Sequence, residues 1–455
     1  MNRLSLIFVP LLMACASRGD FEGSGVSDSA PSVTYYVGMG EDCCGEDPHP
    51  VHGIETDDGY FILGGKFIDS GGTPNGFVLK LSNGRSEHPL LLEDGAEGHE
   101  WTYTFGEANS FDVVNSVASK SGAVFVAGAN QSETGEVQQF LVKLDAISGE
   151  KIWSLVFPVS NGLESAFESI ELTKDGGAVV AGFTNAEPGG VEGFKSYGNP
   201  YGGVANVLYL SASQLDADQA PEGPIWQQEY DGVGSIRSIK ETEDGYVFVT
   251  SRSEELYTVV KIDDVGNQQW SQDLTDHGEA TDIAVVTDAS EQLGFAVTGH
   301  NHNGQGIDGA VTFLEPSGAI RSTTFHGDPA GGVRDFEGLD AGNPSLIYDE
   351  CWGIQPTDKG TVVVACGTGI EDCSLGNAGL GIECRNDPRT TWRSLLMEID
   401  RSGEQVWYRT DSFYYEDDEG AAATAAEHVV QMQSGGFAAV IDQDFGVGLM
   451  VLDSE

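Results

Sequence analysis

One short phrase recurs seven times along this chain and restricts its fold more than any other feature. The phrase is an alternating strand, a turn in which Asp or Ser precedes Gly, and a second strand of small and β-branched residues. The copies are spaced by roughly 60 residues, as in proteins whose stacked repeats bury their apolar faces against one another. They occupy residues 53–64, 116–128, 169–182, 238–250, 282–299, 353–367 and 430–440.

In most copies a third strand ends in an apolar residue and an acidic one, and a glycine turn then leads to a fourth strand. Asp145, Asp263 and Asp400 open three of these turns, where the carboxylate bonds back to the backbone and glycine takes a positive φ. Four antiparallel strands joined by tight turns form one blade of a β-propeller. The sequence therefore predicts an all-β fold, a single β-propeller of seven four-stranded blades over residues 32–455.

The seventh copy has only three strands before the chain stops at Glu455. Residues 32–38 alternate like a fourth strand, and pairing them with residues 447–452 would close the ring. Closure removes the two apolar faces that an open array of blades would expose. Tryptophans that begin the fourth strands are predicted to wedge between blades, with each indole N–H bonded to a carbonyl: Trp101, Trp153, Trp226, Trp270 and Trp407.

Residues 1–14 have the organisation of a secretory signal, with a positive charge at Arg3, an apolar run and a small residue before Cys15. The apolar run is shorter than the roughly 20 residues that span a bilayer, so it predicts a targeting segment. The segment Leu12-Met13-Ala14-Cys15 resembles the lipobox of bacterial lipoproteins, which implies acylation of Cys15. An ordinary cleaved signal is the alternative.

The residue after the cysteine is Ala16 rather than the aspartate that holds lipoproteins at the inner membrane. The resemblance therefore implies an outer-membrane lipoprotein of the bacterial cell envelope, on its periplasmic or surface face, that contacts the membrane through its lipid alone. Residues 15–31 are rich in small and polar residues and predict a flexible tether.

The chain has 22 Lys and Arg against 72 Asp and Glu, a formal net charge of -50. Such a field repels phosphate backbones and anionic lipids, which argues against nucleic-acid binding. The acidic residues are spread along the chain, which favours a well-hydrated surface over a dedicated array of cation sites.

The pattern Asp-x-x-x-Gly-x-x-x-Trp at residues 145–153 resembles the tryptophan-docking motif of quinoprotein-type propellers, and residues 263–270 and 400–407 are looser copies. Residues 170–182 are also similar to propeller repeats common in secreted bacterial proteins. The quinoprotein family includes pyrroloquinoline quinone dehydrogenases and an outer-membrane assembly lipoprotein that uses its propeller as a docking scaffold. The latter usually has eight blades, against the seven counted here.

The vicinal pair Cys43-Cys44 is the one enzymatic hint, because some quinoprotein alcohol dehydrogenases carry a vicinal disulfide against the cofactor. Nothing else matches that cofactor site, so pyrroloquinoline quinone is not expected. Cys43 and Cys44 are therefore interpreted as a structural disulfide or as two half-cystines that pair elsewhere. Cys351 and Cys366 fall opposite each other across a hairpin, which predicts a disulfide. Cys373 and Cys384 would then form a second, although a zinc site from these four cysteines is the alternative.

Two further groups could bind a metal. His300 and His302 alternate in a loop, with Asp308 nearby, but no further ligand is identifiable. Acidic loops are candidates for calcium, among them residues 328–340 and a segment that contains Asp411, Asp417 and Asp418, although none has the spacing of a known calcium loop.

Nucleophile-elbow, phosphate-loop and zinc-helix motifs do not occur in the sequence, so no catalytic residue is predicted. The leading hypothesis is a binding scaffold, for a protein or carbohydrate ligand, whose recognition face is formed by long loops at residues 184–206, 325–350 and 367–393. Two hypotheses remain beside it: a propeller enzyme, either a quinone-dependent dehydrogenase or a carbohydrate-active enzyme, and an outer-membrane assembly partner.

Overall fold

The structure of this protein is a computed structural model. It describes residues 19–40, 46–68, 72–82, 90–91, 98–106, 110–159, 162–187, 203–253, 256–288, 291–302, 307–327, 348–369, 392–415, 421–443 and 446–453. The predicted signal at residues 1–14 and the predicted lipid site, Cys15, lie outside these ranges. In the described part of the chain, no helix has the length and apolarity needed to cross a bilayer.

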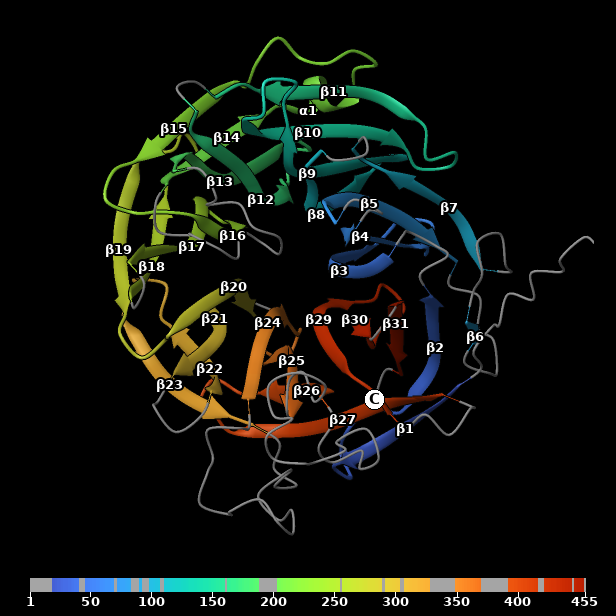
Figure 1. Cartoon of the computed structure of the whole chain (residues 1–455). Helices are drawn as coiled ribbons and strands as arrows, with labels where there is room; N and C mark the ends of the chain where they lie inside the picture. Colours follow the sequence, from blue (N-terminus) through green and yellow to red (C-terminus); the bar gives the residue numbers. More distant parts are fainter. Residues whose placement is uncertain are drawn as a thin grey trace, which may run out of the picture.

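The strands form a ring of seven four-stranded antiparallel blades around a central axis, which confirms the predicted β-propeller (Figure 1). From the axis outward, blade 1 contains β3 (Glu46–Glu55), β4 (Phe61–Ile68), β5 (Pro74–Leu81) and β7 (His99–Thr104). Blade 2 contains β8 (Asp112–Lys120), β9 (Ala123–Gln131), β10 (Val137–Asp145) and β11 (Lys151–Phe157). Blade 3 contains β12 (Glu164–Leu172), β13 (Ala178–Ala186), β14 (Val204–Leu210) and β15 (Trp226–Tyr230).

Blades 4 to 6 follow the same order. Blade 4 contains β16 (Ile236–Thr242), β17 (Gly245–Ser253), β18 (Leu256–Ile262) and β19 (Gln268–Leu274). Blade 5 contains β20 (Glu279–Thr287), β21 (Gln292–His302), β22 (Ile307–Leu314) and β23 (Ile320–His326). Blade 6 contains β24 (Tyr348–Pro356), β25 (Val362–Gly369), β26 (Arg393–Ile399) and β27 (Gln405–Tyr415). Short elements outside the four-strand pattern are β6 (Leu90–Leu91), β28 (Ala421–Ala422) and helix α1 (Ala212–Asp216).

Blade 7 is completed by the other end of the chain, as the sequence predicted. It contains β29 (Thr424–Gln431), β30 (Phe437–Gln443), β31 (Gly446–Leu452) and, on the outside, β2 (Val33–Gly40). β2 pairs antiparallel with β31 from Val33 opposite Leu452 to Gly40 opposite Gly446. Tyr36 is buried in the core of this blade, and its hydroxyl donates a hydrogen bond to Gln443. The ends of the chain are thereby held in one sheet.

Two of the five predicted tryptophan wedges join neighbouring blades through the expected indole hydrogen bond. The Trp101 indole of blade 1 donates to the Ala146 carbonyl of blade 2 at 3.2 Å, and the Trp153 indole of blade 2 donates to the Ala217 carbonyl of blade 3 at 3.1 Å. Gly149 has a φ of +73°, and a Cβ there would lie 2.7 Å from the Trp101 ring. The glycine of the turn is therefore required twice, by the backbone conformation and by the docked indole.

Part of the predicted tether differs from the prediction. β1 (Gly19–Val26) pairs antiparallel with β27, the outer strand of blade 6, in place of a free linker. An outer strand presents unpaired backbone groups, and a nearby extended segment can satisfy them whatever its side chains. The small and polar residues of this segment predicted flexibility, because composition does not show that the outer edge of blade 6 is available for pairing.

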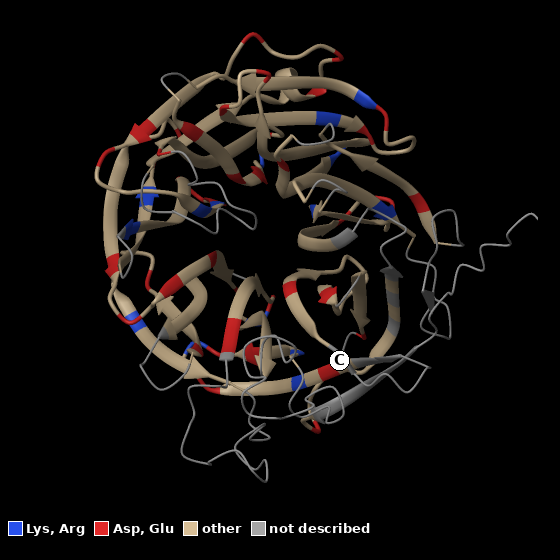
Figure 2. Ribbon diagram, in the orientation of Figure 1, with Lys and Arg blue, Asp and Glu red and all other residues tan. Residues whose placement is uncertain are grey.

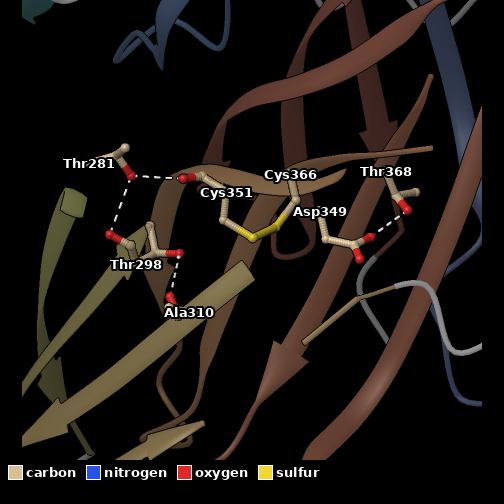
Figure 3. The surroundings of a disulfide bond; sticks show 7 residues. All are labelled: Thr281, Thr298, Ala310, Asp349, Cys351, Cys366 and Thr368. Carbon is tan, nitrogen blue, oxygen red and sulfur yellow. Dashed lines mark hydrogen bonds between the residues drawn. A yellow bond between two sulfur atoms is a disulfide. The ribbon is translucent and has the colours of Figure 1, made fainter. Parts of the chain in front are cut away.

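The predicted disulfide between Cys351 and Cys366 is present, between direct cross-strand partners on β24 and β25 (Figure 3). Both residues are fully buried in the core that blades 5 and 6 share. Thr281 of blade 5 donates to the Cys351 carbonyl at 2.9 Å, so the bridge lies at the junction of the two blades. Cys43, Cys44, Cys373 and Cys384 lie outside the described residues.

Candidate functional site

The innermost strands of all seven blades surround a central channel (Figure 1). It contains a cavity of about 340 Å³, to which every blade contributes at least one residue. We call the face where the inner strands begin the entry face, and the opposite face the exit face. Acidic residues are distributed over the blades, and both acidic and basic residues occur around the channel (Figure 2).

Each inner strand carries a β-bulge at the same place, so one residue in each has no partner on the second strand. A bulge redirects side chains and is common near binding sites. The seven extra residues are all buried: Val51, Asn115, Glu168, Arg237, Thr281, Trp352 and Glu427. Three of them, Glu168, Arg237 and Glu427, have ionisable side chains, which is unusual for buried positions.

In four blades the residue after the bulge accepts a hydrogen bond from a backbone N–H of the next blade. Ser116 accepts a hydrogen bond from the Ile170 N–H at 3.2 Å, and Asp282 accepts one from the Ile354 N–H at 3.0 Å. Blade 6 has Gly353 at this place, where a Cβ would lie 2.8 Å from the Cα of His428. These bonds fix the inner strands against one another, so the channel is a rigid scaffold.

A buried ionic group joins blades 4 and 5 at the entry face. The Arg237 guanidinium lies 3.0 Å from a Glu279 carboxylate oxygen, and His300 Nε2 lies 3.4 Å from the other oxygen. Burial acts to lower the pKa of His300, but the hydrogen bond and charge of Glu279 outweigh it and raise that pKa. His300, a predicted metal ligand, is therefore engaged by a carboxylate beside an arginine. The side chain of His302 is not among those described.

A second group joins blade 7 to blade 1. His49 of β3 lies between two carboxylates, with Nδ1 at 3.2 Å from Asp442 of β30 and Nε2 at 3.8 Å from Glu427 of β29. Burial, with the charge of Lys66, lowers the pKa of His49 well below its usual value. The imidazole is therefore neutral at pH 7, the form that can bind a metal ion.

The channel wall toward the exit face carries a further ion pair. Lys240 Nζ lies 3.5 Å from a Glu171 carboxylate oxygen, and both side chains are partly exposed to the cavity. Burial raises the pKa of Glu171, although Lys240 acts against this shift. On the blade 7 side, the imidazole rings of His52 and His428 stand with centroids 4.1 Å apart. The cavity wall thus offers polar groups of both signs.

Of the three residues named for the predicted acidic site, Asp411 is the one that the structure describes. Asp411 is fully buried on β27, where Arg409 donates to both of its carboxylate oxygens at 2.6 and 2.7 Å. This bidentate pairing occupies the carboxylate with a guanidinium. Asp417 and Asp418 lie outside the described residues. The calcium prediction at this loop is therefore untested beyond Asp411.

The strand ends that flank the three long segments singled out in the sequence lie at one face of the ring. Residues 188–202, 328–347 and 370–391 connect β13 to β14, β23 to β24 and β25 to β26, and the strand ends that flank them lie at the entry face. On the exit face, tight turns such as those at Gly122 and Gly176 connect the first two strands of a blade.

The bulge residues were missed by the analysis of the sequence, yet a signal is present. Adjacent polar residues interrupt the alternation near the start of several repeats, as in Asn115-Ser116, Glu168-Ser169 and Arg237-Ser238. Two neighbouring polar residues in an otherwise buried strand indicate a bulge, because regular alternation would put one of them in the core.

No family model and no curated protein matches the chain. Among solved structures, a quinohemoprotein alcohol dehydrogenase from Pseudomonas putida HK5 matches 93% of this chain and 77% of its own, at 11% identity and a TM-score of 0.45. Sqt1 from Chaetomium thermophilum matches 93% of this chain and 98% of its own, at 12% identity and a TM-score of 0.44. BamB from Moraxella catarrhalis matches 93% and 100%, at 10% identity and a TM-score of 0.36.

These likenesses concern the general propeller architecture. At such identities and TM-scores they carry no information about a substrate or partner of this chain. The seven-bladed fold itself rests on the strand pairing described above.

Proposed function

We propose that this protein is an extracytoplasmic binding scaffold, attached to the outer membrane through acylated Cys15, which binds a protein or carbohydrate ligand at its entry face. The observation that carries the proposal is that the strand ends flanking the three long segments, residues 188–202, 328–347 and 370–391, all lie at this one face. Long connections on a rigid scaffold are where binding surfaces usually form.

The ionised groups near the channel support a scaffold role. Arg237 of blade 4 pairs with Glu279 of blade 5, and His300 of blade 5 contacts the same carboxylate. Paired buried charges of this kind hold neighbouring strands in register, and removing one partner is costly. Their chemistry within the described residues is structural, which leaves recognition to the entry-face segments.

Site-specific photocrosslinking tests the face that binds. A photoreactive amino acid is placed in the entry-face segments, at Phe336 or Asn377, and the matched control carries it in exposed exit-face turns, at Ser148 or Ser317. We expect one reproducible adduct from the entry-face positions in intact cells of the native bacterium, and none from the exit face. Adducts of equal yield from both faces would contradict the proposal.

The anchor is tested separately. Replacing Cys15 with serine removes the thiol that would be acylated, so the Cys15→Ser protein should move from the membrane fraction to the soluble fraction. A wild-type chain that is soluble, or a variant that stays with the membrane, would exclude the lipid anchor while leaving the binding face to be judged by the crosslinks.

A further inference from the structure

The junction between the first and last blades brings together three side chains that bind metals. His49 lies on β3 of blade 1, and Glu427 and Asp442 lie on β29 and β30 of blade 7. One ligand atom from each residue can be chosen so that all three lie within 4.8 Å of one another. Among the described residues, this is the one group of three such side chains that meets this distance.

The three side chains lie within reach of a single transition-metal ion. Zinc binds imidazole nitrogen and carboxylate oxygen at about 2.0–2.2 Å, so two ligands of a tetrahedral ion stand about 3.4 Å apart. His49 lies 3.2 Å from Asp442 through Nδ1 and 3.8 Å from Glu427 through Nε2, and only one of these nitrogens can bind a given ion. One imidazole nitrogen and one oxygen from each carboxylate lie within 4.8 Å of one another, so small side-chain rotations would bring the three ligand atoms to this spacing. An imidazole with two carboxylates suits zinc or a similar ion, whereas calcium prefers six to eight oxygen ligands.

The charges of the group also favour a cation. Glu427 is 4% exposed at its side chain, so its carboxylate is held where water stabilises it little. The comparable junction between blades 4 and 5 places the Arg237 guanidinium against Glu279. At the junction of blades 7 and 1 the nearby cation is Lys66, the cross-strand partner of His49, and two carboxylates surround the imidazole.

We propose that His49, Glu427 and Asp442 form a binding site for one divalent transition-metal ion of the zinc class, which ties the last blade to the first. β2 closes the outer edge of blade 7, and the ion links the inner strands of the same junction. The ring is then fastened at both its outer and its inner edge.

Zinc binding to the full chain tests the site. The protein is purified in detergent without a polyhistidine tag, freed of metal with a chelator, and examined by native mass spectrometry and thermal unfolding with and without zinc. We expect one zinc ion per chain and a rise in Tm of about 3 °C at a hundredfold excess over Kd. The His49→Gln and Asp442→Asn variants should each lose the ion and the rise.

Both substituted side chains are about one quarter exposed, so these variants should fold. Lys66→Gln is the matched control at the same junction, and it should keep the zinc because lysine is not a ligand. Zinc that is absent, or that binds His49→Gln and Asp442→Asn as it binds the wild type, overturns the proposal. A Tm that ignores zinc and rises on acidification would overturn it too, since that result assigns a protonated His49 bridging the two carboxylates.

Discussion

The disulfide between Cys351 and Cys366 should contribute measurably to the stability of the whole ring. It closes a loop with a sequence separation of 15, for which the loss of unfolded-chain entropy corresponds to about 3 kcal/mol at 25 °C. An unfolding entropy of about 2.1 cal/mol/K per residue gives about 1 kcal/mol/K for 455 residues. Reduction of this one bond should therefore lower Tm by about 3 °C.

The assay is thermal unfolding followed by circular dichroism, with and without dithiothreitol, on the wild type and on the Cys351→Ala/Cys366→Ala variant. Alanine is chosen because serine would bury two hydroxyls in a core where both cysteines are fully enclosed. Reductant should lower the Tm of the wild type and leave that of the variant unchanged.

Three results would refute this reasoning. A wild-type Tm that is insensitive to a reductant shown by mass spectrometry to have opened the bond would mean that loop entropy does not limit stability. A variant that still responds to reductant would assign the effect to another disulfide, among Cys43, Cys44, Cys373 and Cys384. Equal Tm values for the oxidised wild type and the variant would show that the bond contributes nothing.

Three further predictions follow from particular contacts. Gly122→Ala should lower the free energy of unfolding by about 1–2 kcal/mol through backbone strain alone, since its φ is +80° and nothing lies within 4 Å of the new Cβ. Gly149→Ala should lower it by about 1–3 kcal/mol more, because its Cβ also meets the docked Trp101 indole. Denaturant titration of the two variants measures the difference, which isolates the contact with the indole. Burial lowers the pKa of His277 from 6.5 to about 4, so on acidification the unfolded state takes up a proton before the folded state does. The free energy of unfolding should therefore fall as the pH drops from 6.5 toward 4. His277→Gln should make the loss between pH 7 and pH 5 smaller by about 2 kcal/mol, and an unchanged pH profile would contradict this. Arg409→Met should lower the free energy of unfolding by about 3–5 kcal/mol, because it leaves the buried Asp411 carboxylate without its partner. Adding Asp411→Leu should restore most of this stability. A double variant as unstable as Arg409→Met would show that the unpaired carboxylate is not the cause.

The blades could be predicted because their signals are local. Alternation with a period of two, an acidic residue before a glycine turn and a tryptophan after it each depend on a few consecutive residues. Cys351 and Cys366 belong to the same class, since a turn at Lys359-Gly360 fixes which residues face each other. The closing strand β2 was also predictable, because a count of strands per repeat left one place empty.

The charged groups between blades could not be predicted in this way. His49 and Glu427 lie near opposite ends of the sequence, and no local pattern relates them. His300 could be named as a candidate ligand, but whether it meets a metal or a carboxylate depends on Glu279, which comes from a different strand. Asp411 likewise resembled a loop carboxylate until the fold enclosed it beside Arg409.

The sequence by itself therefore determined the repeat, the number of blades, the closing strand and one disulfide, because turn chemistry and alternation act over short distances along the chain. The tertiary structure alone decided which polar residues meet. In a ring, the first blade packs against the last, and a bulge on each inner strand turns one side chain toward its neighbour. These contacts arise from closure of the ring, which is a property of the whole chain.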